Sequence, residues 1–561
     1  MTVSTTPVDK LPTAAQSAAG RWPAWLEAVV VALAGALFFR LLLSDLMVDD
    51  APAYVEALHA NRFVWDVAHL WVQPLALVAF RLLSPALNAV QLLEAMNVTA
   101  CALAMGIFFR TLRLAGLSLS RALAGVALLA VSFNIVSLGP TAHIKLLVFP
   151  ALAAALHYAV RWESALQAGR PSLRDLAISG AWLGVGATLL VSVLPMGPFI
   201  ALMALWAVRR QGVGWPAAWR AGLAFGVAMG ISGLVFLLAG YLTALMTDTT
   251  DAGLVAFVRG SVADKDAMHA GFFGFVEVPA RIIYSLIYNF AFLPDIGSLG
   301  RAAMHGMVHD LKPYAPRLLR DALVAGGTLL ALGAILWFSV RTVLQRRGHL
   351  MPFGFLLGAA AFAAYWNLND PEHWFQFTLP IVVLIALNCP RRVASLLLFV
   401  WMPALAVVNL GLYGVHKARF DVAANVQDAR EKIGTQGLYV GYAGYPGEPD
   451  SSVLPVPGMQ RLRLDTLFYA SRDAQKIHAQ MTQAIDTTLA RGGRVFVFRV
   501  LDEGDWRGPI LALSMSGLSR TELSRTLRER YVIADETVVG GFPAHEIIGI
   551  KREVALAPQH P

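Results

Sequence analysis

Two adjacent carboxylates, Asp49 and Asp50, stand near the start of the sequence, and Tyr54 follows them. Neighbouring carboxylates resist ionising together, so one of them can take a proton from a substrate. The pair can equally hold a metal ion or solvate a loop, and the residue types alone leave these three interpretations open. We take Asp49 and Asp50 as candidate catalytic residues and Tyr54 as a candidate substrate contact.

Two further polar runs carry side chains that can contact a substrate. The first run contains Asp66 and His69, and the second, NLNDPEHWFQ over 367–376, contains Glu372 and His373. All four are candidate substrate-binding residues. The second run is also explained by polar residues that cap the ends of two helices, and we keep both interpretations.

Three basic residues are candidates for binding a phosphate, because a leaving phosphate needs cations nearby. His143 and Lys145 lie two residues apart with no acidic neighbour, although Lys145 can alternatively extend to a membrane interface. Arg281 lies in the apolar and aromatic stretch 278–294, which is suited to lie along such an interface. These three residues form the predicted phosphate-binding set.

A metal site is not indicated by the sequence. His305, His309 and Asp310 have suitable side chains, but no second matching cluster accompanies them. We therefore assign no metal ligands and no certain cofactor, and we leave a requirement for a divalent metal open.

The elements that must position these residues are membrane helices. Hydrophobic residues make up 57% of the 561 residues and charged residues 15%, whereas soluble domains carry roughly 25% charged residues. A membrane span needs about 20 mostly apolar residues. We predict about eleven spans, near residues 24–44, 88–109, 121–138, 144–160, 175–194, 196–208, 219–245, 320–340, 350–367, 375–389 and 393–414.

The basic residues predict the orientation of these spans, because loops rich in Lys and Arg stay in the cytoplasm. If the N-terminus is cytoplasmic, the short outside connections at 139–143, 193–197 and 367–374 contain no Lys or Arg. The apolar stretch 67–86 would break this alternation if it crossed the membrane. Its His, Gln and Arg residues also fit poorly in lipid, so we expect it at the membrane surface.

We expect a transmembrane domain over 1–415, with a first external loop at 45–87 and a long external loop at 246–319. Charged residues become frequent after this domain, and helix-like and strand-like segments alternate over 416–561. This pattern predicts a soluble α/β domain outside the cytoplasm. All three regions lie on one face, so a site built from them faces away from the cytoplasm.

The net charge, the cysteines, a sequon and a glycine-rich run each argue against a particular function or site. The net charge of +8 is mostly taken up by the cytoplasmic loops, so we expect no nucleic-acid binding. Cys101 and Cys389 both fall in predicted spans and form no disulfide framework. The sequon Asn97-Val98-Thr99 also falls in a span and means nothing as a glycosylation site. The glycine-rich run at 441–447 lacks the lysine and the strand-to-helix order of a phosphate loop.

The first loop resembles that of the GT-C glycosyltransferases, in particular the protein O-mannosyltransferase and aminoarabinose-transferase branch. Those enzymes carry one or two acidic residues after the first span, followed by a surface segment with a Phe-Asp-x-His-Pro-Pro-Leu or Lys-Pro-Pro-Leu motif. Here the order is Asp49-Asp50, then Asp66 and His69, then Pro74-Leu75. The histidine is one position later than in the family, and one proline remains.

The run around Glu372 and His373 resembles a short external loop that precedes a proline-containing helix late in the membrane part of GT-C enzymes. Trp374 stands where that family has an arginine, and Pro380 follows in the next span.

This resemblance implies a GT-C-like polytopic fold and an enzyme of the bacterial inner membrane. Such an enzyme moves a sugar from a polyprenyl-phosphate donor to a glycan, lipid or protein acceptor at the outer face. An acidic residue of the first loop would deprotonate the acceptor hydroxyl while the lipid phosphate leaves.

Two other classes stay open. An O-antigen polymerase or ligase also acts on lipid-linked glycans outside, but it would be expected to have an arginine-rich external loop and no soluble tail of this size. A transporter or flippase would carry charged groups within its spans and often internal repeats. The predicted spans hold few acidic residues, Glu94 among them, and no repeat is seen.

Overall fold

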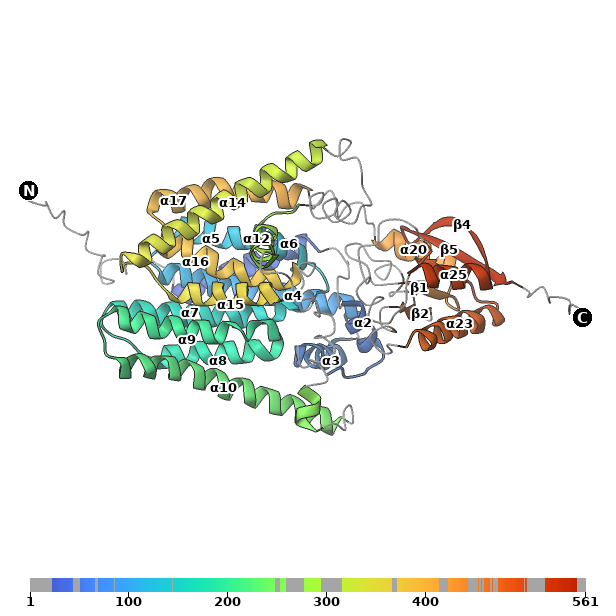
Figure 1. Cartoon of the computed structure of the whole chain (residues 1–561), viewed down its shortest axis with the longest axis horizontal. Coiled ribbons are helices and arrows are strands. Elements are labelled where there is room, and N and C mark those ends of the chain that lie inside the picture. The colour runs from blue at the N-terminus through green and yellow to red at the C-terminus, as the bar shows by residue number, and fades with distance from the viewer. Residues whose placement is uncertain are drawn as a thin grey trace, which may run out of the picture.

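The structure is a computed structural model of the chain. It describes residues 23–43, 51–65, 69–84, 86–143, 145–247, 253–258, 277–293, 315–365, 371–412, 422–441, 453, 456, 459–464, 467, 473–498, 500–501 and 520–551. Figure 1 shows a bundle of helices and, beyond one end of it, a sheet with its own helices.

Helices occur at each of the apolar stretches of the sequence. The first half of the bundle contains α1 (Ala24–Leu41), α4 (Ala89–Leu114), α5 (Leu119–Val131), α6 (Phe133–Leu138), α7 (Phe149–Gln167), α8 (Leu173–Leu189), α9 (Met196–Arg210) and α10 (Trp215–Met246). The second half contains α14 (Ala315–Leu344), α15 (Met351–Tyr365), α16 (Thr378–Asn388), α17 (Arg391–Leu396), the π-helical segment η6 (Leu397–Trp401), α18 (Met402–Ala406) and the π-helical segment η7 (Val407–Leu412).

Five helical segments in the described part of the chain are long and apolar enough to cross a membrane. They are Ala89–Leu114, Val191–Arg210, Trp215–Met246, Ala315–Leu344 and Arg391–Gly411. Shorter apolar helices occur at Val72–Leu83, Leu119–Val131, Met351–Ala364 and Trp374–Asn388. The structure is therefore a helical bundle with several helices that could span a membrane, while the number of about eleven spans stays a prediction.

Short elements connect the bundle helices. They are α2 (Ala51–His59), α3 (Val72–Leu83), η2 (Lys145–Val148), η3 (Val191–Val193), α12 (Glu277–Phe290) and η5 (Pro371–Phe377). Figure 1 shows α2 and α3 at the end of the bundle nearest the sheet, which we call the sheet end. The 12 residues of α3 rise about 18 Å, too little to cross a hydrocarbon core of about 30 Å.

Glycines allow several bundle helices to approach closely. A Cβ atom at Gly358 of α15 would lie 2.3 Å from the Cα of Met196 at the start of α9. A Cβ atom at Gly180 of α8 would lie 2.3 Å from the carbonyl oxygen of Phe225 in α10. Small residues at helix contacts are typical of membrane bundles, where packing drives association. In contrast, α10 and α14 flank the bundle in Figure 1 and expose most of their apolar surface.

The C-terminal part of the described chain forms a five-stranded mixed sheet. Its strands are β1 (Leu438–Gly441), β2 (Gln460–Arg463), β3 (Val495–Phe498), β4 (Tyr531–Val539) and β5 (Phe542–Ile550), in the order β2-β1-β3-β5-β4. The pairs β1–β2 and β1–β3 are parallel, and β3–β5 and β4–β5 are antiparallel. Three helices accompany the sheet, α20 (Val422–Ile433), α23 (Ala474–Ala490) and α25 (Arg520–Arg530).

Both faces of this sheet are covered. Side chains alternate between faces along a strand, so Val495 and Val497 of β3 pack in one apolar cluster with residues of α23 and α25. Phe496 and Phe498 pack in a second cluster on the opposite face, with residues of α20. The alternation of helix-like and strand-like segments expected over 416–561 is present, and β1 and β3 are two of its strands. Neither β2 nor the β4–β5 hairpin was expected from the sequence.

Candidate active site

The two short helices of the first loop are joined by hydrogen bonds. Gln73 of α3 is buried, and its Nε2 donates to the carbonyl oxygen of Arg62 at 2.8 Å. Its Oε1 accepts from the backbone N–H of Val64 at 2.9 Å. Arg81, at the other end of α3, donates from Nε to Oδ1 of Asn61 at 2.8 Å. These bonds fix α3 against the chain that leaves α2, so the loop packs as one unit.

This loop packs against the turn that follows α6. Tyr54 of α2 is buried in an apolar cluster with Val72 and Leu77 of α3, Leu93 of α4 and Ala142. Ala142 directly precedes one of the predicted phosphate-binding residues. The structure thus brings the helix that begins just after the acidic pair into the same cluster as the turn that carries two of the predicted cations.

Both predicted phosphate-binding residues of the turn are buried. His143 exposes 1% of its surface and Lys145 exposes 4%. Lys145 begins η2, which packs against α4, α7 and α8. A lysine that extends to the interface would keep its ammonium group in contact with water, and the low exposure of Lys145 argues against that alternative. Buried charges in proteins are paired or bound to a ligand.

An aromatic cluster joins η5 to α12. The rings of Tyr284 and Tyr288 in α12 are stacked at 5.6 Å, and Trp374 of η5 meets both edge-on at 5.6 and 5.4 Å. Phe375 of η5 also meets Phe149, the first residue of α7, at 5.7 Å. The element with the second polar run therefore lies against both α12 and the start of α7.

Buried amides hold the C-terminal end of α12 inside the bundle. Asn289 is hydrogen-bonded through Nδ2 to Oγ1 of Thr378 at 2.8 Å, and its Oδ1 accepts from Nδ2 of Asn134 at 3.3 Å. Asn409 donates from Nδ2 to the carbonyl oxygen of Phe290 at 2.6 Å. Polar groups within a membrane bundle must find protein partners, so these contacts fix where α12 enters.

The segment from α6 to η2 lies between these two groups of elements. It contacts α12 and η5 through α6, and it contacts α4 through η2. The first loop therefore shares a cluster with the His143–Lys145 turn, and η5 and α12 pack against α6, which precedes that turn. Such an arrangement can hold an anion on the two cations and place a second substrate near the first loop.

The sheet also approaches the first loop. Figure 1 shows β2 beside α2. Partial burial lowers the pKa of His59, the last residue of α2, and the positive charge of Arg461 in β2 lowers it further. The two parts of the molecule are close enough for a charge on one to act on the other.

The chain is similar to solved GT-C glycosyltransferases. One is the protein O-mannosyltransferase Pmt1-Pmt2 complex of S. cerevisiae bound to the sugar donor, with 14% identity, coverage of 39% of this chain and 34% of that chain, and a TM-score of 0.33. The chain thus spans about a third of that relative. Another is the oligosaccharyltransferase AglB of Archaeoglobus fulgidus in complex with an inhibitory peptide and a dolichol-phosphate. The identity is 11%, the match covers 96% of this chain and 75% of that chain, and the TM-score is 0.42.

A third is ArnT of Cupriavidus metallidurans bound to undecaprenyl phosphate, with 11% identity and a TM-score of 0.37. This match covers 93% of this chain and 97% of that chain. No protein-family model matches the sequence, and a comparison with curated proteins gave no match. Because these TM-scores lie below 0.5, the function has to be argued from the chain's own residues.

The predicted site residues fall into three groups. Asp49, Asp50 and Asp66 lie outside the described residues. The backbones of Arg281, Glu372 and His373 lie on α12 and η5, and their side chains are outside the described part. The side chains of Tyr54, His69, His143 and Lys145 are described, and all four are buried. The first loop and the His143–Lys145 turn come together, and η5 comes together with α12.

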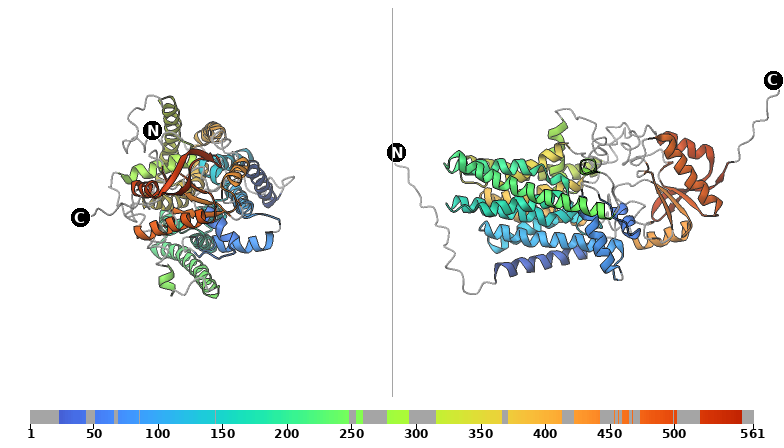
Figure 2. Two further views of the ribbon diagram at one scale, coloured as in Figure 1. Left: turned by 90° about the vertical axis from the view of Figure 1, so that its right-hand side faces the viewer. Right: turned by 90° about the horizontal axis from the view of Figure 1, so that it is seen from below.

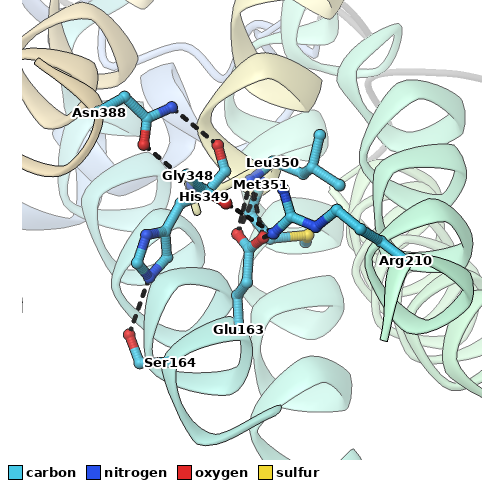
Figure 3. Close-up of polar contacts among 8 residues, drawn as sticks. All are labelled: Glu163, Ser164, Arg210, Gly348, His349, Leu350, Met351 and Asn388. Atoms are coloured by element: carbon cyan, nitrogen blue, oxygen red, sulfur yellow. Dashed lines mark hydrogen bonds and ion pairs between the residues drawn. The ribbon is translucent and has the colours of Figure 1, made fainter. Parts of the chain in front are cut away.

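A buried polar cluster at the opposite end of the bundle was not foreseen (Figure 3). The carboxylate of Glu163 in α7 accepts from the backbone N–H groups of Leu350 and Met351 at 2.7 to 2.9 Å. Arg210, at the end of α9, lies 3.5 Å from Glu163 and donates to the carbonyl oxygen of Gly348 at 2.6 Å. Arg210 stood in a predicted cytoplasmic loop, where its charge was explained by topology alone, and Glu163 was not among the expected site residues. They hold α7, α9 and the start of α15 together.

Among the residues that the structure describes, no group of three or more His, Cys, Asp or Glu side chains lies close enough together to hold a metal ion. The earlier candidates His305, His309 and Asp310 lie outside those residues.

Proposed function

We propose that this protein is a GT-C-type glycosyltransferase that moves a sugar from a polyprenyl-phosphate donor to an acceptor at the outer face of the membrane. One observation carries the proposal. The helix that begins just after Asp49 and Asp50 shares, through Tyr54, an apolar cluster with Ala142 of the turn that bears the buried side chains of His143 and Lys145. A base and an anion-binding group are what such a transfer requires on the two sides of the anomeric carbon.

In the proposed reaction, Asp49 or Asp50 accepts the proton of the acceptor hydroxyl. The acceptor oxygen forms a bond to the anomeric carbon of the sugar, and the bond from that carbon to the phosphate oxygen breaks. The electron pair of the broken bond goes to the leaving polyprenyl phosphate. His143, Lys145 and Arg281 stabilise the phosphate as its negative charge develops, and Tyr54, Asp66, His69, Glu372 and His373 contact the substrates.

The two-sided character of α12 supports a lipid donor. Ile283 is 44% exposed on its outer side, whereas Ser285 and Asn289 are completely buried. An apolar outer face beside the aromatic cluster of Tyr284, Tyr288 and Trp374 suits a polyprenyl chain that lies along the membrane interface.

The proposal includes a location. We place the N-terminus in the cytoplasm of a bacterial cell, the sheet end of the bundle at the outer face of the inner membrane, and residues 416–561 outside the cytoplasm as a separate α/β domain. The positive-inside distribution of Lys and Arg supports this orientation.

The test is sugar transfer by the purified protein in reconstituted membranes, with a polyprenyl-phosphate sugar as donor. Asp49→Asn or Asp50→Asn should lower the rate by about 100-fold or more, because a positioned base contributes that much. Glu56→Gln is the matched control, since Glu56 is an exposed acid on α2 in the same loop. Full activity in both aspartate variants would contradict the assigned base.

A further inference from the structure

Asn97 is a buried amide in the N-terminal part of α4, and it contacts the turn that follows α6. It is completely buried. Its Nδ2 donates to the carbonyl oxygen of Thr141 at 2.9 Å and approaches that of Leu138 at 3.4 Å. Because both partners are carbonyl oxygens, the amide nitrogen must face the turn. Both donors of the side chain are thus directed at one short segment, 138–141.

The chain leaves α6 at Leu138, and the residues 139–143 that follow are not helical, so their carbonyl groups are not part of a continuous helix. Within this segment the carbonyl oxygen of Leu138 also accepts from the N–H and Oγ1 of Thr141, so the contribution of Asn97 lies mainly in its bond to the carbonyl oxygen of Thr141. A buried carbonyl without a partner is costly, which makes an amide donor from α4 a strong constraint on the path of the turn. His143 follows the bonded Thr141 by two residues.

Other contacts restrict the same turn. A Cβ atom at Gly139 would lie 2.8 Å from the ring of Phe39 in α1. Ala142 packs in the cluster that contains Tyr54. Packing on both sides limits where the turn can lie, and Asn97 supplies the directional bonds that packing lacks.

We propose that Asn97 is a positioning residue that holds the His143–Lys145 turn in the conformation that binds the donor phosphate. This inference rests on the proposed function, because it takes these two cations as the phosphate-binding groups. It gives the first residue of the Asn97-Val98-Thr99 run a role inside the bundle.

The experiment measures binding of two probes to the purified protein in nanodiscs, a polyprenyl phosphate and the polyprenol of the same chain length. Asn97→Leu keeps the branch at Cγ and removes the donors, although leucine is larger than asparagine. It should weaken binding of the phosphate about tenfold and leave polyprenol binding unchanged. Asn97→Ser, which keeps one donor, should weaken binding of the phosphate less than Asn97→Leu does. In transfer assays Asn97→Leu should raise KM for the donor more than it lowers kcat.

The matched control is Asn388→Leu at the opposite end of the bundle. Asn388 is 2% exposed and bonds both backbone groups of His349, at 2.9 and 3.0 Å (Figure 3). This variant removes a comparable buried amide, so it should lower stability. It should change the binding of the polyprenyl phosphate and of the polyprenol to the same extent. Equal weakening of both probes by Asn97→Leu, or phosphate-selective weakening by Asn388→Leu, would overturn the inference.

A third variant separates the inference from the proposed function. If Lys145→Met leaves binding of the polyprenyl phosphate unchanged, the proposed phosphate site itself fails. If Lys145→Met weakens that binding and neither Asn97 variant does, only the positioning role fails.

Discussion

Glu163 shows how much one buried side chain can hold at the end of the bundle away from the sheet. Its carboxylate satisfies two N–H groups at the start of α15 and the guanidinium of Arg210. The side chains of Glu163 and Arg210 are 0% and 5% exposed. Removal of one partner from such a pair leaves the other charge buried and uncompensated.

Glu163→Gln should therefore lower the free energy of unfolding by about 3 kcal/mol or more, measured as a fall in the thermal midpoint in detergent. Arg161→Gln is the control, because the Arg161 side chain is 52% exposed in its 3.1 Å pair with Asp175, and pairs with a solvent-exposed partner contribute about 1 kcal/mol or less. If the two variants have the same midpoint, Glu163 does not have the role assigned to it.

At this scale the sequence indicated which residues were unusual but not what they contact. Lys145 stood out because it lacked an acidic neighbour, and its burial agrees with a role inside the protein. Arg210 looked like any other cytoplasmic charge, and Asn97 like part of a meaningless sequon. Their partners Gly348 and Thr141 are distant in sequence, so no local pattern reveals these bonds.

At the scale of elements, the contact between α9 and α15 depends on glycine. Gly354 and Gly358 lie one turn apart on α15, and added Cβ atoms would lie 2.8 Å from the Cα of Ile200 and 2.3 Å from the Cα of Met196. Backbone atoms cannot move aside as a flexible side chain can. Any larger residue here must push the two helices apart.

Gly358→Ala should destabilise the protein by about 1 to 3 kcal/mol through this overpacking. Gly333→Ala in α14 should be neutral or stabilising by up to about 1 kcal/mol, because a Cβ atom there meets nothing within 4 Å and alanine favours a helix. Thermal midpoints of the two variants give the comparison, and a midpoint of Gly358→Ala at or above that of the unaltered protein would show that α9 and α15 do not pack this way.

Apolar length predicted where helices occur, because a long apolar run has few alternatives to a buried helix. It did not predict where helices break. The stretch 121–138 divides into α5 and α6 at Ser132, whose extended backbone interrupts the helix. The β4–β5 hairpin was missed because β4 carries exposed acidic residues at 535 and 536, which hide the alternation typical of a strand.

At the scale of the whole molecule, the order of helices in the bundle was the least predictable feature. Lipid tails are as apolar as leucine, so hydrophobicity does not choose the neighbours of a membrane helix, and packing and polar contacts do. Here those contacts join distant segments, as in the bond between Asn289 of α12 and Thr378 of α16. Figure 2 shows that this bundle and the sheet lie end to end along the long axis, with the first loop between them.

The position of the sheet relative to the first loop leads to a prediction about His59. The positive charge of Arg461 in β2 disfavours the protonated imidazole and so lowers the pKa of His59. Arg461→Gln removes that charge and should raise this pKa, so His59 should lose its proton at a higher pH than in the unaltered protein. The pH dependence of carbethoxylation of His59, followed by peptide mass spectrometry, measures the shift because only the neutral imidazole reacts.

Arg491→Gln serves as the control, since Arg491 is an exposed residue at the end of α23 that does not act on His59. It should leave the titration of His59 where it was. A titration that is the same in Arg461→Gln as in the unaltered protein would mean that β2 does not approach α2. The sheet would then have no direct access to the loop that carries the proposed base, and any influence of residues 416–561 on transfer would have to pass through the bundle.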